Sequence, residues 1–313
     1  MATMSEPIAP PRSSATSAAI RTRDLTKHYD ATVGIDALDL EVASGSVFGF
    51  LGPNGAGKTT TIRLLVGLLR PTRGSAQVAG HDVWSQRRAV HRIVGYLPGD
   101  FVAYPDTTGR QYLGYLGDLR GGVARSRIDE LAERLELDLH RRIGDLSSGN
   151  RQKVGLIQAF MHDPQVLVLD EPTSGLDPLM QRTFLAMTRE ARDAGRTVFL
   201  SSHVLSEVEQ IADAVGIVRD GRLAVVEHVA ALKARAVRRL DLTFVDTPPI
   251  EALRAQLGVQ EVRGDGRRVH VLVEGSLEGL MRTAGAAGLE NVVTHEADLE
   301  QIFLDYYTAE GSR

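Results

Sequence analysis

Apolar and polar residues alternate near the start of the chain with the two-residue period of a half-buried strand. Leu38, Leu40 and Val42 are each separated by one polar residue, and the compact apolar stretch Ser46–Leu51 follows them. The period then lengthens to that of an amphipathic helix, which we expect to end before Pro71. Its apolar positions are Ile62, Leu65, Val66 and Leu69. The pattern therefore predicts strands that lead through a loop into a helix.

The middle of the chain continues to alternate between strand-like and helix-like segments. Gln165–Asp170 is apolar on both faces, which is typical of a strand buried in a parallel sheet. Thr197–Ser201 predicts another strand, and Asp220–Gly221 predicts the turn of a β-hairpin. Residues 100–162 have a mainly helical pattern. Strands that alternate with helices predict a largely parallel α/β core over residues 20–226.

Three further segments lie outside this core. Residues 1–19 are rich in Pro and Ser and predict a flexible polar leader. Residues 227–237 predict a linker helix, and residues 238–313 predict a small α+β accessory domain. Its element order is β-α-β-β-α-β, closed by a helix over Leu299–Tyr307. That order is the split βαβ, or ferredoxin-like, arrangement.

Composition narrows the classes of function. Hydrophobic residues make up 43% of the 313 residues, enough for a packed core, and the net charge of −4 gives no surplus for a polyanion, so we expect no nucleic-acid partner. The absence of cysteine excludes disulfides, thiolate metal sites and cysteine nucleophiles. No apolar run is long enough to span a bilayer, and the start lacks a signal-peptide core. We therefore expect a cytoplasmic protein whose membrane role, if any, depends on a partner chain.

The glycine-rich segment Gly52–Thr59 fits the pattern G-x-x-x-x-G-K-[ST] at every fixed position, between a predicted strand and a predicted helix. A triphosphate must be met by several backbone N–H groups, and glycine allows the close approach and positive φ that this needs. The N-terminus of the following helix adds partial positive charge. We expect Lys58 to reach the β- and γ-phosphates and the Thr59 hydroxyl to bind Mg²⁺.

Two carboxylates follow the buried strand that ends at Asp170. A carboxylate at the end of such a strand can hold Mg²⁺, directly or through water, and we assign this role to Asp170. The next residue, Glu171, is placed to polarise an attacking water. An acidic pair at a strand end is a weak signal alone, but together with the phosphate loop it predicts a nucleoside-triphosphate hydrolase.

With these motifs in place, the sequence resembles the nucleotide-binding subunit of an ATP-binding-cassette (ABC) transporter over about residues 21–226. Leu146–Asn150 is similar to the family's signature Leu-Ser-Gly-Gly-Gln, Ser174–Asp177 to its D-loop, and His203 to its switch histidine. Tyr29 stands where the family stacks an aromatic ring on adenine. The resemblance implies a P-loop NTPase core, with a mostly parallel sheet and a helical subdomain that carries the signature.

The resemblance also implies the site residues and partners. It implies catalytic roles for Lys58, Glu171 and His203. It also implies that Thr59 and Asp170 bind Mg²⁺. The residues implied to contact ATP are Tyr29, Gly52, Pro53, Asn54, Gly55, Ala56, Gly57, Lys58, Thr59, Thr60, Ser147, Ser148, Gly149 and Asp177. The signature of one chain would serve the nucleotide of another, so that a homodimer or pseudo-dimer encloses two ATP molecules. A separately encoded transmembrane permease subunit would hold the chain at the inner face of the membrane.

The sequence departs from the family pattern at two places. The signature has Ser148 for glycine and Asn150 for glutamine, which keeps small or hydrogen-bonding side chains, so we expect function to be retained. In the lid segment Gly95–Gly99, Gly99 stands where the family has glutamine and offers no side chain to Mg²⁺ or water. Either Asp100 takes over that contact or a water molecule does.

Three functions fit the resemblance. Three segments are similar in sequence to multidrug or antibiotic-resistance exporter subunits, namely Arg151–Leu156, Ser201–Glu207 and Asp298–Leu304. This similarity makes an exporter ATPase the main prediction. An importer ATPase with a ligand-sensing C-terminal domain is the second. A soluble ABC protein without a transport role is the third, although the chain has one phosphate loop, no heptad run and no cysteine.

Overall fold

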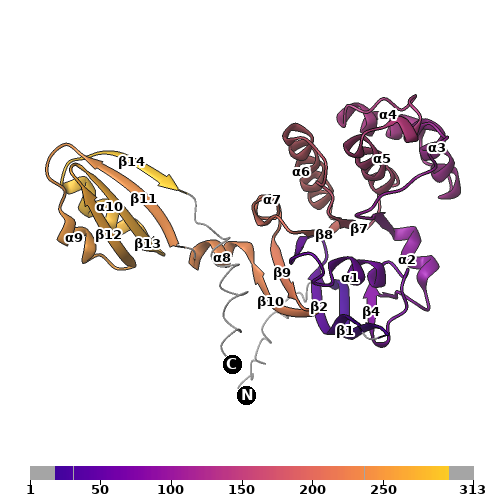
Figure 1. Cartoon of the computed structure of the whole chain (residues 1–313), viewed down its shortest axis with the longest axis horizontal. Coiled ribbons are helices and arrows are strands. Elements are labelled where there is room, and N and C mark those ends of the chain that lie inside the picture. Colours follow the sequence, from indigo (N-terminus) through magenta and orange to yellow (C-terminus); the bar gives the residue numbers. More distant parts are fainter. Residues whose placement is uncertain (1–17, 31, 236, 296–313) are drawn as a thin grey trace, which may run out of the picture.

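The computed structural model describes residues 18–30, 32–235 and 237–295 (Figure 1). Strands in these residues form three sheets. The first is antiparallel and has the order β2-β1-β4-β5. Its strands are β1 (Ala18–Tyr29), β2 (Thr32–Ala43), β4 (Arg73–Val78) and β5 (His81–Asp82). Because β1 begins at Ala18, Ala18 and Ala19 belong to a strand and not to the predicted leader, whose residues 1–17 lie outside the described ranges.

The second sheet is the central one and has the order β10-β9-β3-β8-β7-β6. All neighbouring pairs are parallel except β9 and β10, which form the hairpin predicted at Asp220–Gly221. The strands are β3 (Val47–Leu51), β6 (Val94–Leu97), β7 (Val166–Asp170), β8 (Thr197–Ser202), β9 (Ala214–Arg219) and β10 (Arg222–His228). Every residue of β3, β7 and β8 is buried, as expected for strands covered on both faces.

Successive residues of the central strands face two different cores. Leu167 and Leu169 of β7 face the core that includes helices α5 and α6, whereas Val166 and Val168 face the core that includes α1 and the first sheet. Helices α3, α4 and α5 form a group at one side of the sheet (Figure 1). The helices are α1 (Lys58–Leu65), α2 (Arg87–Ile93), α3 (Gly109–Leu119), α4 (Arg125–Arg134), α5 (Ser148–Phe160), α6 (Pro178–Asp193) and α7 (Leu205–Glu209), with a 3₁₀ turn at Ile143–Asp145.

Local sequence explains where the helices that frame the site begin and end. Ser147 caps α5 by accepting from the Asn150 N–H, and Asp177 caps α6, which starts with a proline. The prediction that the first helix continues to Leu69 was wrong. The helix ends at Leu65, because Gly67 adopts a left-handed φ of 68° that terminates it.

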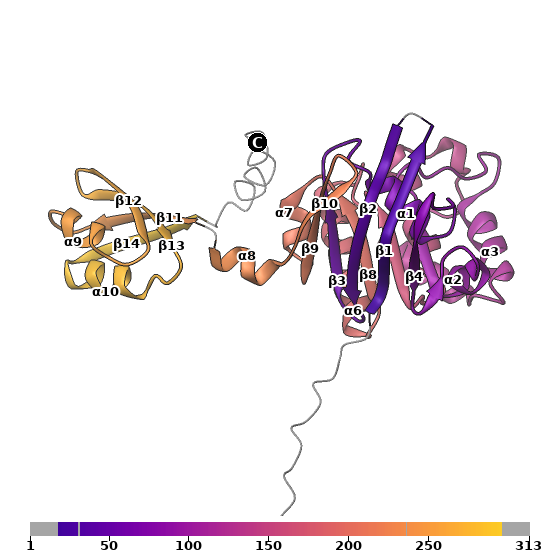
Figure 2. The ribbon, with the colours of Figure 1, turned by 90° about the horizontal axis from the view of Figure 1, so that it is seen from below.

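The third sheet is antiparallel and has the order β12-β13-β11-β14, which is the ferredoxin-like strand order. It has its own hydrophobic core, and Figures 1 and 2 show it apart from the other sheets, joined through α8. Its elements are β11 (Val237–Phe244), α9 (Ile250–Arg254), β12 (Val259–Asp265), β13 (Arg268–Glu274), α10 (Glu278–Ala286) and β14 (Leu289–His295). Helix α8 (Val229–Arg235) is shorter than the predicted linker helix, because β10 continues to His228. The predicted closing helix Leu299–Tyr307 lies outside the described residues.

Candidate active site

The phosphate loop connects β3 to α1, and two of its glycines adopt conformations that other residues rarely reach. Gly55 has a φ of 82° and Gly57 a φ of 104°. A Cβ atom on Gly57 would lie 2.6 Å from the Gly34 carbonyl oxygen, so the loop has room only for glycine there. No side chain caps the N-terminus of α1, which leaves its first N–H groups available to an anion.

Lys58 is the first residue of α1, and its side chain is only 6% exposed. Its ammonium group donates to the carbonyl oxygens of Gly52 at 2.6 Å and Pro53 at 3.2 Å, and lies 3.3 Å from Glu171 Oε1. These contacts compensate a buried charge and fix the ammonium beside the loop. An anion held by the loop would therefore meet a positive charge that is already positioned.

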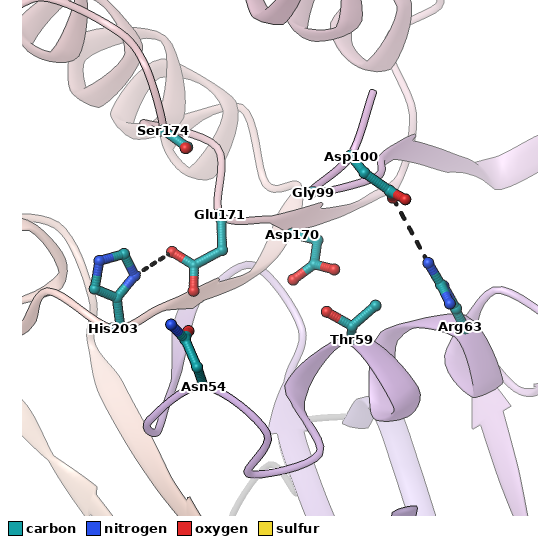
Figure 3. A pocket seen from close by; sticks show the side chains of 9 residues that line it. All are labelled: Asn54, Thr59, Arg63, Gly99, Asp100, Asp170, Glu171, Ser174 and His203. Carbon is teal, nitrogen blue, oxygen red and sulfur yellow. Dashed lines mark hydrogen bonds and ion pairs between the residues drawn. The ribbon is translucent and has the colours of Figure 1, made fainter. Parts of the chain in front are cut away.

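Two cavities adjoin the loop and share Asn54, Thr59 and Glu171. One, of about 330 Å³, extends from the loop toward β1 and β2. The residues that line it are Tyr29, Thr32, Val33, Gly34, Pro53, Asn54, Gly55, Gly57, Lys58, Thr59, Thr60 and Glu171. The other, of about 420 Å³, is shown in Figure 3. The residues that line it are Asn54, Thr59, Arg63, Gly99, Asp100, Asp170, Glu171, Ser174 and His203.

Asp170 has the properties of a residue that holds a cation. Its side chain is 1% exposed, and Oδ1 accepts a hydrogen bond of 2.5 Å from Ser201 Oγ. Oδ2 is buried and has no partner, an arrangement that costs free energy unless a ligand satisfies it. The Thr59 side chain lines the same cavity (Figure 3). An oxygen pair of this kind fits Mg²⁺, which takes few protein ligands and completes its shell with phosphate and water.

Glu171 follows Asp170 and is held from several directions. Its φ of 48° lies in the left-handed region, which is strained for a residue other than glycine. Its Oε2 lies 2.8 Å from His203 Nδ1, and its Oε1 faces Lys58. The side chain thereby points into the cavity between the phosphate loop and His203 (Figure 3). The carboxylate is accessible to a water molecule and has one face fixed by the imidazole.

Two positioning residues were not predicted from the sequence. Ser201 Oγ accepts from the Glu171 N–H at 3.0 Å while it donates to Asp170, so one hydroxyl orients both acidic residues. Gln152 on α5 is buried and its Nε2 donates to the carbonyl oxygens of Glu171 and Pro172, both at 3.2 Å. The sequence marked Ser201 as the end of the predicted strand Thr197–Ser201, but only the structure shows that this strand lies beside the one that ends at Asp170. No sequence signal marked Gln152.

The signature motif lies away from the phosphate-loop cavities of its own chain. Ser147 caps α5, and a Cβ atom on Gly149 would lie 2.4 Å from the Gly175 carbonyl oxygen, so the signature packs against the D-loop. Asp177 Oδ1 accepts from the N–H groups of Leu179 and Met180 at 3.0 Å, and these bonds lower the pKa of Asp177. Ser147, Ser148, Gly149 and Asp177 line neither cavity, and neither do the loop residues Gly52 and Ala56.

The structure places Tyr29, the residue predicted to stack on adenine, beside the phosphate loop. It ends β1 and lines the smaller cavity, and its hydroxyl lies 3.4 Å from Thr60 Oγ1. The ammonium of Lys27 lies 5.5 Å from the centre of its ring. The structure therefore brings Tyr29 to the rim of the phosphate loop.

The lid segment shows how Gly99 and Asp100 are placed. A Cβ atom on Gly99 would lie 3.3 Å from Asp170 Oδ2, so Gly99 leaves space beside that oxygen. The Asp100 side chain is 79% exposed and pairs with Arg63 at 3.6 Å, so its carboxylate turns toward Arg63 and not toward Asp170 (Figure 3). Burial, with the charge of Asp170 as a second cause, raises the pKa of the nearby Tyr96 to about 12. The Asp100 carboxylate therefore lies away from the space that Gly99 leaves beside Asp170 Oδ2.

The fold and the site together define a P-loop nucleoside-triphosphatase, and comparison with known proteins identifies the family. Residues 35–174 match the family model described as ABC transporter. The chain is 35% identical to the bacitracin transport ATP-binding protein BcrA of Bacillus licheniformis, over 91% of this chain and 96% of that protein. It is 37% identical to the daunorubicin resistance ATP-binding protein DrrA3 of Streptomyces coeruleorubidus, over 89% and 92%.

A solved ATP-binding subunit of an ABC transporter has the same fold. It is 27% identical, with a TM-score of 0.64 over 69% of this chain and 92% of that chain. The chain therefore belongs to the ABC transporter family, as an ABC-type ATPase. Among the described residues, no helix is both long and apolar enough to cross a membrane.

Proposed function

We propose that the chain is the ATPase subunit of an exporter whose substrate path lies in a separately encoded transmembrane permease. The relatives named for bacitracin transport and daunorubicin resistance support the exporter role. The observation that carries the ATPase role is the convergence of Lys58, Asp170 and Glu171 on the two cavities beside the phosphate loop. The chain would work at the cytoplasmic face of the membrane, where ATP is available.

In this proposal the phosphates of ATP occupy the loop Gly52–Thr59 at the N-terminus of α1. Lys58 exchanges its carbonyl contacts for the β- and γ-phosphates. Thr59 and Asp170 would hold Mg²⁺, which when bound would supply positive charge to the phosphate oxygens. Asp170 Oδ2, buried and without a partner, supports this assignment.

Glu171 orients the attacking water and accepts its proton as the water oxygen bonds to the γ-phosphorus. The bond from that phosphorus to the bridging oxygen breaks, and ADP and phosphate leave. His203, 2.8 Å from Oε2 of Glu171, holds the carboxylate toward the water. The strained φ of Glu171 and the hydrogen bond from its N–H to Ser201 fix the direction of its side chain.

The working form in this proposal is a head-to-tail homodimer. Ser147 and Gly149 lie at the N-terminus of α5, which can bind an anion, yet they line neither cavity of their own chain. A second copy, turned end to end, would bring them to the γ-phosphate of the first. ATP would then join two chains, and hydrolysis would release them.

Light scattering tests the dimer with two variants. Glu171→Gln keeps the shape of the side chain but removes the base, so with ATP its mass should double and stay doubled. Adding Ser147→Arg should restore the monomer while ATP binding persists, because the bulky charge faces only the opposite chain. Ser75→Arg, at an exposed position of β4, is the matched control and should leave the dimer intact. A monomer under every condition, with and without the permease chain, would contradict the sandwich.

The exporter role is tested in cells that produce the chain together with its permease. Cells with the wild-type chain should tolerate bacitracin or daunorubicin better than cells with Glu171→Gln, and should accumulate less of the compound. Greater accumulation with the wild-type chain would indicate an importer. No effect of the permease on ATP hydrolysis would indicate a soluble ABC protein.

A further inference from the structure

The segment between the phosphate loop and the lid carries an unusual excess of positive charge. From residue 42 to residue 99 the only acidic residue is Asp82, whereas the whole chain has a net charge of −4. The basic residues of the same stretch are Lys58, Arg63, Arg70, Arg73, Arg87, Arg88 and Arg92. Lys58, Arg63 and Arg73 have carboxylate partners, so the excess is concentrated in the remaining four.

These four arginines lie on two segments that pack against each other. A Cβ atom on Gly67 would lie 3.3 Å from the Cβ of Arg87, and His91 Nε2 lies 2.8 Å from the Val66 carbonyl oxygen. The connection from α1 to β4 and the helix α2 therefore form one surface. We call this surface the arginine–tryptophan patch. It consists of Leu68, Arg70, Trp84, Arg87, Arg88 and Arg92.

Trp84 contacts two arginines of the patch and is the only tryptophan of the chain. The guanidinium carbons of Arg70 and Arg87 lie 5.8 Å and 5.6 Å from its ring centre. Such cation–π contacts hold a guanidinium in place without removing its charge. Leu68 adds an apolar side chain that is 54% exposed.

No carboxylate of the described residues pairs with the arginines of the patch. Among the described residues, Arg70, Arg87, Arg88 and Arg92 form no ion pair, unlike Arg127, Arg134 and Arg196. Asp82 is occupied, since its Oδ1 accepts from the Trp84 N–H and from both the N–H and the hydroxyl of Ser85. The hydrogen bonds from Ser85 lower the pKa of Asp82. Four exposed guanidiniums thus remain available to an external anion.

We propose that the arginine–tryptophan patch binds the headgroups of anionic phospholipids at a membrane surface. Guanidinium groups bind phosphate through two parallel hydrogen bonds. Tryptophan prefers the interface between headgroups and acyl chains, and exposed leucine is stabilised there. An acidic protein surface would match the charge but gives no reason for the exposed Leu68 beside the half-buried Trp84. The proposal rests on the patch alone and not on the exporter role.

Trp84 itself reports on the proposed contact, because all tryptophan emission of the full-length protein comes from the patch. The protein is titrated with vesicles of phosphatidylcholine alone and with vesicles that contain phosphatidylglycerol in addition. Anionic vesicles should shift the emission to shorter wavelength, brominated acyl chains should quench it, and added salt should weaken binding. Vesicles of phosphatidylcholine alone should leave the emission unchanged.

The matched variants carry the same change in charge at different places. Arg87→Gln, Arg88→Gln and Arg92→Gln together should reduce binding to anionic vesicles at least tenfold. The control combines Arg125→Gln, Arg142→Gln and Arg182→Gln, which are exposed elsewhere, and should reduce it less than threefold. Equal binding to both kinds of vesicle, equal loss in the two triple variants, or no response of Trp84 to anionic vesicles would each overturn the proposal. The salt dependence of the wild-type protein tests it even if a variant fails to fold.

Discussion

Replacing Ser201 with alanine removes the hydroxyl that orients both acidic residues of the site. The hydroxyl is buried, donates to Asp170 at 2.5 Å and accepts from the Glu171 N–H at 3.0 Å. A hydrogen bond to a charged group contributes about 1.5–3 kcal/mol. If the lost free energy falls on the transition state, kcat should decrease by roughly 10- to 100-fold. We expect a smaller change in KM, because the phosphate loop is not touched.

The assay is steady-state ATP hydrolysis at a series of Mg²⁺ concentrations. Because Asp170 loses its one hydrogen bond, the Mg²⁺ concentration for half-maximal activity should rise several-fold as kcat falls. Ser202→Ala is the matched control, since within the described residues the Ser202 hydroxyl forms hydrogen bonds with Val204 and none with the two acidic residues. The activity of Ser202→Ala should stay within about threefold of wild type, because the variant loses only a weak hydrogen bond between neutral groups. A Ser201→Ala protein with wild-type kcat and wild-type Mg²⁺ dependence would refute the positioning role.

Three further predictions concern the loop, the lid and pH. Lys58→Ala should abolish ATP hydrolysis, because it deletes the charge beside the phosphates. If this variant hydrolysed ATP at the wild-type rate, the assignment of the phosphate site would be wrong. Asp100→Ala should leave turnover nearly unchanged, because its exposed pair with Arg63 contributes at most about 1 kcal/mol; a tenfold loss would contradict this. Burial, and secondarily the charge of Arg120, lower the pKa of His162 to about 4. The unfolded chain therefore binds the proton more readily, so the free energy of unfolding should decrease by about 1–2 kcal/mol as the pH falls from about 6.5 to 4. In denaturant unfolding, the free energy of unfolding of His162→Gln should no longer decrease in this way between pH 6.5 and about 4. A decrease as large as that of the wild-type protein would contradict the prediction.

The parts of the fold that could be predicted are those in which the local backbone conformation or burial restricts the residue types that fit. Phosphate binding requires glycines at the left-handed positions of the loop, and burial on both faces requires the apolar strand before Asp170. The small antiparallel sheet near the C-terminus was predicted from the alternation of Leu240, Leu242 and Phe244 and from the turn at Asp265–Gly266. Helix ends were less predictable, as Gly67 shows by ending α1 before the apolar spacing does.

The contacts that complete the site could not be predicted because they join distant segments. Ser201 contacts Asp170 from the neighbouring parallel strand, and Gln152 contacts the Glu171 carbonyl from α5, a helix that begins within the signature. The role of Ser147 depends on a second chain, so neither the sequence nor the fold of one chain tests it. The pairing of Asp100 with Arg63 depends on the backbone path of the lid segment. The presence of glycine at position 99 does not by itself specify that path.

ATP hydrolysis by Glu171→Gln, measured together with the nucleotide that stays bound, tests the role of Glu171 most directly. Turnover should fall by roughly 10²- to 10⁴-fold, as expected for loss of a general base. The protein should retain ATP in uncleaved form, since Lys58, Thr59 and the loop are unchanged. Hydrolysis by Glu171→Gln at the wild-type rate, or loss of ATP binding by the folded variant, would contradict the assignment of Glu171 as the residue that activates water.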